Sequence, residues 1–125
     1  MSKLAAWLVS LAALFNSPAN AETISDISPA KAQQLISQGA LLIDVRTEEE
    51  FNAGHLAGAQ HIEYQAIATQ LPQQLTDKTQ PIVLYCRSGR RADIAKQALQ
   101  QLGYNAVVNA GGYEELANEF SAPNK

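Results

Sequence analysis

The residues that decide the fold are Pro81 to Arg91, with the sequence PIVLYCRSGRR. The run 81–85 is apolar almost throughout, which is typical of a strand covered on both faces of a parallel sheet. The next six residues, 86–91, include one cysteine, one glycine and three arginines, and residues with helical periodicity follow them. We therefore predict a buried strand at 81–85, a short loop at 86–91 and a helix at 92–102 that Gly103 ends.

The predicted helix at 92–102 has apolar residues at spacings of one, three and four, which places them on one helical face. These residues are Ile94, Ala95, Ala98, Leu99 and Leu102. We expect this stripe to be ordinary hydrophobic core that packs against the sheet and needs no cofactor.

The same alternation of strand-like and helical stretches continues over the chain from residue 22 onward and predicts an α/β fold. We expect a central, mainly parallel sheet of about five strands with helices on both faces. The predicted strands are 24–27, 41–45, 60–62, 81–85 and 104–109. The predicted helices are 30–37, a short helix that ends near residue 53, 64–75, 92–102 and a terminal helix that ends near residue 120.

Local signals mark the ends of some of these helices. Ser28 is a favoured N-cap residue, and Thr47 with Glu50 three residues later forms a capping box for the short helix. Pro72 lies inside 64–75, where it lacks the amide proton that a helix requires. We therefore expect Pro72 to break or kink the second half of that helix.

The first 21 residues have the pattern of a signal peptide for export. Lys3 precedes the mostly apolar stretch 4–15, and an A-x-A cleavage motif stands at 19–21. A membrane anchor is the alternative, but a helix of about twelve residues rises only about 18 Å, whereas a bilayer core needs roughly 20 apolar residues. We expect a signal peptide at 1–21, one domain at 22–125, a periplasmic location and no membrane partner after cleavage.

The charge and the cysteine content exclude several classes of protein. The formal net charge is −3 at pH 7, so nothing in the overall charge favours nucleic acid as a partner. Cys86 is the only cysteine, so no disulfide can form within the chain. A solitary thiol is a buried small hydrophobe, an intermolecular link or a reagent.

The position of Cys86 favours the reagent. A loop that enters a helix at the carboxyl end of a parallel strand aims several backbone N–H groups into one concavity, and such concavities bind anions. Arg87, Arg90 and Arg91 add positive charge that favours the thiolate and would hold a dianion such as thiosulfate. The alternative is a structural cysteine beside a solvated basic turn, but Cys86 ends the strand, precedes the basic loop and has no cysteine partner.

Four motifs in the same order resemble the successive signatures of the rhodanese family. They are Asp44-Val45-Arg46, EFNAGHLAGA at 50–59, CRSGRR at 86–91 and Gly111-Gly112-Tyr113. The resemblance implies a rhodanese-like fold and a thiosulfate sulfurtransferase that needs no cofactor. It implies thiosulfate as the small-molecule donor of sulfur and cyanide or a thiol as the acceptor, with an acceptor protein as a further candidate partner.

The resemblance also assigns roles to residues. Cys86 would carry the sulfur as a persulfide. The substrate would be bound by the other residues of the active loop, Arg87, Ser88, Gly89, Arg90 and Arg91. Ala92 stands where many members have serine or threonine, so a hydroxyl contribution at that position is absent.

The remaining motif residues are expected to support the site. Asp44 and Arg46 lie two positions apart at the carboxyl end of a central strand. There the carboxylate can fix loop amides and pair with the arginine. We interpret His55 as a structural loop residue, because sulfite leaves thiosulfate without needing a proton. Gly111 and Gly112 would provide a tight turn before Tyr113.

A cysteine-dependent phosphatase is the nearest alternative enzyme, since it also places a thiolate in an anion-binding loop between a strand and a helix. That chemistry needs an arginine six positions after the cysteine to wrap the phosphoryl oxygens. Here Ala92 occupies that position and Arg91 comes one residue early. A non-catalytic sulfur-binding or regulatory module is the other alternative, although such a module has no need to retain Cys86.

Two further site classes fit the sequence poorly. A thiol–disulfide oxidoreductase needs a second, resolving cysteine, which the chain lacks. Cys86, His55 and His61 do not have the spacing of metal ligands, so we predict no metal site.

Overall fold

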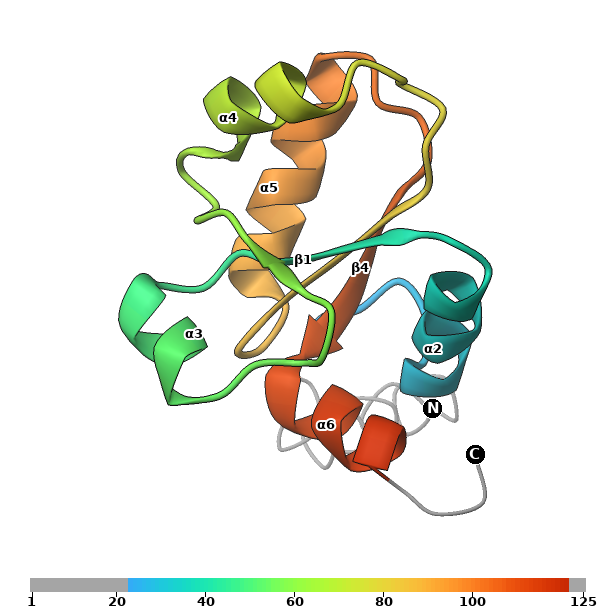
Figure 1. The fold of residues 1–125 in the computed structure, drawn as a ribbon, viewed down its shortest axis with the longest axis vertical. Coiled ribbons are helices and arrows are strands. Elements are labelled where there is room, and N and C mark those ends of the chain that lie inside the picture. The colour runs from blue at the N-terminus through green and yellow to red at the C-terminus, as the bar shows by residue number, and fades with distance from the viewer. Residues whose placement is uncertain (1–22, 122–125) are drawn as a thin grey trace, which may run out of the picture.

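A four-stranded parallel sheet is the centre of the computed structural model, which describes residues 23–121. The predicted signal peptide at 1–21 lies outside these residues. The strand order is β2-β1-β3-β4, with β1 Leu41–Asp44, β2 Gln60–His61, β3 Ile82–Cys86 and β4 Val107–Gly112. The helices are α2 Pro29–Ser37, α3 Glu48–Ala53, α4 Ile67–Gln74, α5 Arg90–Gln101 and α6 Tyr113–Ser121 (Figure 1).

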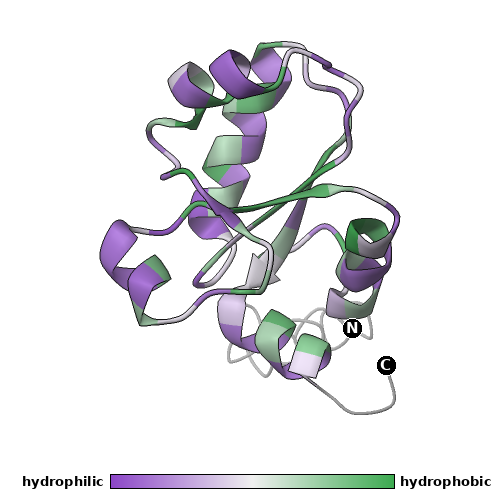
Figure 2. Cartoon of the chain, viewed as in Figure 1, coloured by the Kyte–Doolittle hydropathy of each residue, from purple (hydrophilic) through white to green (hydrophobic). Residues whose placement is uncertain are grey.

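Helices cover both faces of the sheet, as the sequence predicts. α4 and α5 lie on one face, and α2 and α6 lie on the other (Figure 1). Side chains alternate along a strand, so Ile82, Leu84 and Cys86 of β3 pack toward α5, whereas Val83 and Tyr85 pack toward α2 and α6. Both faces of β3 are therefore buried, and Figure 2 shows the strands as a mainly hydrophobic centre between helices of mixed hydropathy.

Two helices begin where their capping residues predict. The Ser28 side chain accepts a hydrogen bond from the Lys31 amide at the start of α2. Thr47 and Glu50 form both bonds of the capping box at the start of α3.

None of the described helices is both long and apolar enough to cross a membrane.

The helix predicted at 64–75 is shorter than expected, and its proline does not break it. α4 begins only at Ile67 and continues through Pro72 to Gln74. The missing amide proton of Pro72 removes one helical bond close to the end of the helix, and the Leu75 amide still donates to the Leu71 carbonyl at 2.8 Å. The expected break was therefore wrong, while the alternative of a kink at Pro72 stays a prediction.

The predicted fifth strand at 24–27 is absent from the described sheet. Ile24 donates its amide to the Ser88 carbonyl at 2.8 Å, and Asp26 donates its amide to the Asn109 carbonyl at 2.7 Å. The return bond from the Asn109 amide goes to the Asp26 carboxylate at 2.8 Å instead of to a backbone carbonyl. A side chain has thus replaced a backbone partner, so 24–27 lies against the sheet without forming a regular ladder.

The last strand lies further along the chain than the prediction of 104–109. β4 extends to Gly112, with an irregular register between Leu84 and Cys86 of the neighbouring strand. The glycine pair therefore belongs to the strand rather than to a separate turn. A Cβ atom on Gly112 would lie 2.6 Å from the Arg87 carbonyl oxygen, so this close packing against the loop requires glycine.

The core face of α5 differs in part from the predicted stripe. Ala92, Ala95 and Leu99 are fully buried, whereas Ile94 is 50% exposed and Leu102 is 40% exposed. The helix begins at Arg90, two residues earlier than predicted, and its buried positions follow spacings of three and four from Ala92. The first fully buried side chain after Cys86 is therefore that of Ala92, which is not polar.

Candidate active site

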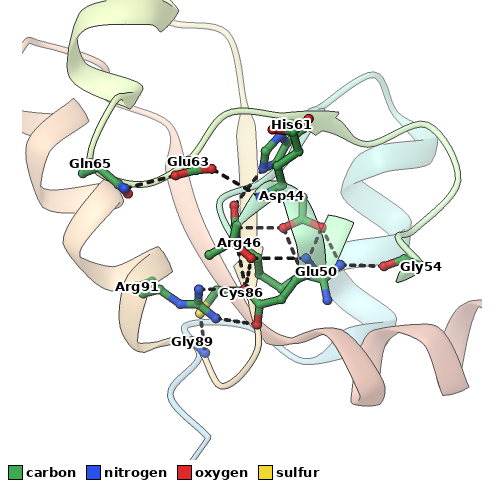
Figure 3. A network of polar contacts seen from close by, with 12 residues as sticks. Asp44, Arg46, Glu50, Gly54, His61, Glu63, Gln65, Cys86, Gly89 and Arg91 are labelled. Atoms are coloured by element: carbon green, nitrogen blue, oxygen red, sulfur yellow. Dashed lines mark hydrogen bonds and ion pairs between the residues drawn. The ribbon is translucent and has the colours of Figure 1, made fainter. Parts of the chain in front are cut away.

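Cys86 is the last residue of β3 and lies directly before the loop that leads into α5. Its side chain is 1% exposed. The Gly89 amide donates a hydrogen bond to the Cys86 Sγ atom at 2.9 Å (Figure 3). Burial alone would suit a structural cysteine, but a backbone N–H directed at the sulfur from a loop is the geometry of an anion-binding site.

The loop is short because Gly89 is already the N-cap of α5. Gly89 has a φ of +92°, a conformation that residues with a side chain rarely adopt, and its carbonyl accepts the Asp93 amide at 2.9 Å. The amino end of the twelve-residue helix α5 therefore lies next to Cys86. The partial positive charge at a helix N-terminus stabilises an anion placed there.

The three arginines that follow Cys86, Arg87 in the loop and Arg90 and Arg91 in the first turn of α5, are in different environments. Arg91 makes two hydrogen bonds to the Glu50 carboxylate, at 2.9 and 3.1 Å (Figure 3). These bonds are the main reason why the pKa of Arg91 is raised, and interactions with Cys86 raise it further. Arg87 and Arg90 are exposed and form no ion pair with another residue of the described part of the chain. Two of the three arginines are therefore available to a bound anion.

Glu50 connects α3 to the active loop. The same carboxylate accepts the Thr47 amide in the capping box and the guanidinium of Arg91. The hydrogen bonds from Arg91 are the main cause that lowers the pKa of Glu50 to about 2. Sequence reasoning found the capping role of Glu50 but missed the ion pair, because the two residues are 41 positions apart.

We expect Glu50→Gln to remove a stabilising charge whose effect depends on pH. Because the pKa of Glu50 falls from 4.5 to about 2 on folding, its contribution is complete above pH 4.5 and is lost as the pH falls toward 2. Urea denaturation from pH 2 to pH 7 should show Glu50→Gln to be less stable than the parent at pH 7. The difference in unfolding free energy between the two proteins should shrink as the pH is lowered from 4.5 toward 2. A difference that stays constant with pH would contradict this role of the ion pair.

Asp44 and Arg46 form a buried ion pair beside the loop, as the sequence predicts. The Asp44 carboxylate accepts the Arg46 backbone amide at 2.9 Å and its Nη2 atom at 2.7 Å. Arg46 Nη2 also donates to the Gly54 carbonyl at 2.7 Å (Figure 3). Burial is the largest single influence on the pKa of Arg46 and lowers it, but the hydrogen bond and charge of Asp44, with weaker interactions with Tyr85 and Glu50, together leave the pKa raised. This pair ties the end of β1 to the segment after α3.

The guanidinium of Arg46 also lies against two aromatic rings. It lies 4.4 Å from the centroid of the Tyr113 ring and 5.6 Å from that of Tyr85. The Tyr85 hydroxyl accepts the Leu56 amide at 3.1 Å, and burial raises the pKa of Tyr85. Tyr113 of the glycine-glycine-tyrosine motif therefore packs on the buried ion pair, which explains why the motif ends in an aromatic residue.

The two histidines have partners away from Cys86. His55 Nδ1 lies 2.9 Å from the Phe51 carbonyl, and its ring stacks on Phe51 at 3.7 Å. His61 Nε2 lies 2.7 Å from the Arg46 carbonyl (Figure 3). Within residues 23–121, no three side chains of the metal-binding types come close enough together to hold a metal ion.

Sequence reasoning also missed two residues behind the loop. Asn109 of β4 is fully buried, and its Nδ2 atom donates to the Gly89 carbonyl at 2.7 Å. Asp26 accepts the Asn109 amide and forms an ion pair with Lys96 of α5 at 2.9 Å. The one signal in the sequence was a polar residue inside an otherwise apolar strand.

A pocket of about 420 Å³ opens beside the loop. Arg87 lines it from the loop, Glu50 and Gly54 from the region of α3, and Tyr113 and Glu114 from the start of α6. The site thus combines a buried thiol, a loop amide directed at its sulfur, exposed cations and an adjoining open space. Together with the parallel sheet, it defines an α/β domain with a single thiol at the carboxyl end of a strand, beside exposed arginines and the amino end of a helix.

Comparison with known proteins agrees with this class of domain and narrows it to one family. Residues 28–119 match the family described as Rhodanese-like domain, and the chain belongs to this family. It is 35% identical over 75 residues to the thiosulfate sulfurtransferase PspE of Escherichia coli strain K12, which covers 60% of this chain and 72% of the relative. Within the family, the four motifs and the signal-peptide pattern of the sequence also predict a particular resemblance to phage-shock protein E, and this match confirms that resemblance.

Other relatives have the same kind of name and fold. The thiosulfate sulfurtransferase GlpE of Pseudomonas aeruginosa strain LESB58 is 30% identical, over 76% of this chain and 84% of its own length. A solved structure described as a rhodanese with anions from E. coli is 33% identical, with a TM-score of 0.60, and covers 63% of this chain and 93% of its own. The human single-domain sulfurtransferase TSTD1 is 26% identical, with a TM-score of 0.65, over 81% and 98% of the two chains. The predicted fold class is therefore confirmed, with four described strands instead of about five.

Proposed function

We propose that this protein is a thiosulfate sulfurtransferase that carries a sulfur atom on Cys86 as a persulfide. The observation that carries the proposal is the buried Cys86 Sγ atom with the Gly89 amide 2.9 Å away, at the amino end of α5. Membership of a family with relatives named thiosulfate sulfurtransferases supports the choice of substrate. The chemistry uses only the thiol and the loop and needs no cofactor.

The reaction has two transfers of the same sulfur atom. The Cys86 thiolate attacks the outer sulfur of thiosulfate, the S–S bond of thiosulfate breaks, and sulfite leaves with the bonding electrons. Cyanide or a thiolate then attacks the outer sulfur of the persulfide and releases Cys86 as a thiolate. Thiocyanate or an acceptor persulfide is the product. Because Cys86 is 1% exposed, the donor must be small enough to enter the loop.

Arg87 and Arg90 are the residues that we assign to attraction of the donor. Both are exposed next to the loop and have no counter-ion among residues 23–121, whereas Arg91 is held by Glu50. Two exposed positive charges near one site raise the local concentration of an anion, and salt weakens this effect. Ser88 and Gly89 complete the loop that we propose as the binding site for thiosulfate.

We expect the double variant Arg87→Ala with Arg90→Ala to raise the KM for thiosulfate by roughly tenfold at low ionic strength. Added salt should raise the KM of the parent more than that of the variant, because the variant has lost the charges that salt screens. Lys31→Ala, which removes an exposed cation from α2, is the matched control and should behave as the parent. Equal KM values for parent and double variant would assign attraction of the donor to the backbone amides.

The pocket beside Arg87 is the place that we propose for the acceptor. It is open, it adjoins the active loop, and it is lined by both cationic and anionic side chains. A small thiol or a cysteine side chain of an acceptor protein could reach the outer sulfur of the persulfide from there. The supporting pair Asp44 and Arg46 forms one wall through Arg46.

We further propose that the protein works in the periplasm as a mature domain of residues 22–125. The support is the signal-peptide pattern at 1–21. Mass spectrometry of the protein recovered from the periplasm of a bacterial host should give Glu22 as the first residue.

Two assays on the same preparation test the class of reaction. The parent should form thiocyanate from thiosulfate and cyanide and should not hydrolyse an aryl phosphate faster than Cys86→Ser does. The sixth position after Cys86 is held by Ala92, which is fully buried in the core and offers no group to a phosphoryl oxygen. A parent that hydrolyses the phosphate and forms no thiocyanate would overturn the assignment.

A further inference from the structure

The peptide group between Ser88 and Gly89 has a partner at each end. Its N–H donates to the Cys86 Sγ atom at 2.9 Å. Its carbonyl, on Ser88, accepts the backbone amide of Ile24 at 2.8 Å. The N–H and C=O of a trans peptide point in opposite directions, so the bond from Ile24 holds the N–H toward the sulfur.

The next peptide group is held in the same way. The carbonyl of Gly89 accepts the Nδ2 atom of the buried Asn109 at 2.7 Å. Asn109 cannot turn away, because its Oδ1 atom accepts the Gly111 amide at 2.9 Å. The carbonyl of the peptide between Gly89 and Arg90 is therefore fixed behind the loop, on the side of β4.

These two partners are coupled to each other through Asp26. The Asp26 amide donates to the Asn109 carbonyl, and the Asp26 carboxylate accepts the Asn109 amide. Lys96 of α5 holds the same carboxylate with two hydrogen bonds, at 2.9 and 3.1 Å. The segment 23–27 is thus attached to β4 and to α5 at the point where Ile24 reaches the loop.

We propose that the backbone amide of Ile24 and the side chain of Asn109 are positioning groups for the sulfur site. They bond to the carbonyls of two successive loop peptides and so keep the Gly89 amide directed at Cys86. Hydrogen bonds in a chain polarise one another, so the Ile24 bond also strengthens the donor that faces the sulfur. The inference rests on the proposed function in one respect, because the anionic sulfur that benefits is the thiolate or persulfide of Cys86.

The packing leaves the segment no freedom to shift toward the loop. A Cβ atom built on Gly89 would overlap the Ile24 carbonyl oxygen, so the two backbones are in direct contact. The Asn109 side chain is fully buried. An apolar side chain at this position would avoid the cost of burying a polar carboxamide group. Both polar atoms of the Asn109 side chain have partners, one on the loop and one on β4.

Ile24→Pro tests the inference, because proline removes the one N–H that bonds to Ser88. Ile24→Ala is the matched control, since it also removes the side chain but keeps the N–H. The readout is the rate at which iodoacetamide alkylates Cys86 from pH 5 to pH 10, which needs neither thiosulfate nor an acceptor. We expect the profile of Ile24→Pro to move to higher pH and its sulfur transfer to fall by roughly tenfold, while Ile24→Ala keeps the parental profile.

Asn109→Asp provides a second test from the other side of the loop. Aspartate keeps the shape and the acceptor for Gly111 but cannot donate to Gly89. Asn105→Asp adds the same charge at an exposed position and is its control. We expect only Asn109→Asp to move the alkylation profile in the same direction as Ile24→Pro.

The outcomes separate this inference from the proposed function. If Ile24→Pro and Asn109→Asp are folded and both keep the parental alkylation profile, the inference is wrong even if the parent forms a persulfide. If the profiles move but the parent takes no sulfur from thiosulfate, the positioning role stands and the proposed function fails. If Ile24→Pro does not fold, Asn109→Asp against Asn105→Asp decides, and the absence of a difference there overturns the inference.

Discussion

Replacing Cys86 by serine is expected to slow sulfur transfer from thiosulfate to cyanide by roughly 10³-fold or more, because a persulfide can form only on a thiol. The fold should survive the change. Serine is close to cysteine in size, and its hydroxyl can still accept the Gly89 amide that now bonds to Sγ. We expect the free energy of unfolding to fall by about 1 kcal/mol. Initial rates of thiocyanate formation and urea denaturation measure the two effects separately.

Cys86→Ala is the companion variant, because it also removes the weak hydroxyl nucleophile. Both variants should show the same background rate. If Cys86→Ser transferred sulfur at the parental rate, the carrier would be another residue and the proposed function would be wrong.

Gly89→Ala is expected to have the next largest effect, because two independent features of the structure demand glycine there. Its φ of +92° costs a residue with a Cβ atom about 1–2 kcal/mol. The new Cβ would also overlap the carbonyl oxygen of Ile24. The loop or the segment 23–27 must therefore move, and the Gly89 amide loses its direction toward Cys86. We expect sulfur transfer to fall by roughly 10²-fold, as for removal of one preorganised donor.

Gly103→Ala is the control for the backbone effect alone. Gly103 has a φ of +100°, close to that of Gly89, but a Cβ there would meet nothing within 4 Å, and it lies just after the other end of α5. It should lose similar backbone stability yet keep the parental rate. A Gly89→Ala variant that retains full activity would show that the loop amide is not needed for transfer.

The sequence predicts the part of the site that is local in the chain. The apolar run before Cys86, the basic loop and the helix after it are all found in the structure, and the capping box of Thr47 and Glu50 is confirmed. Each of these features depends on neighbours within a few positions, whose types decide the local structure. The pair of Asp44 and Arg46 was also predicted, since it spans only two positions.

The contacts that the sequence could not predict join distant segments. Glu50 meets Arg91 across 41 positions, and Asp26 meets Asn109 across 83. Nothing in the residue types selects these pairs over others. The fifth strand failed for a related reason, because a side chain, Asp26, took the place of a backbone acceptor.

The exposed Ile94 shows the limit of periodicity. The spacing rule identified one face of the helix after Cys86. Residues at the edge of that face are buried in some cases and exposed in others, so spacing alone does not decide their burial. The position of the helix start, which Gly89 sets, decided that Ala92, Ala95 and Leu99 form the buried face.

The intact mass of the protein before and after incubation with thiosulfate tests the central claim most directly. The parent should gain the mass of one sulfur atom and lose it again when cyanide or a thiol is added. Cys86→Ser should gain nothing under the same conditions. A parent whose mass stays unchanged, or a Cys86→Ser variant that gains the sulfur, would contradict the assignment of Cys86 as the carrier.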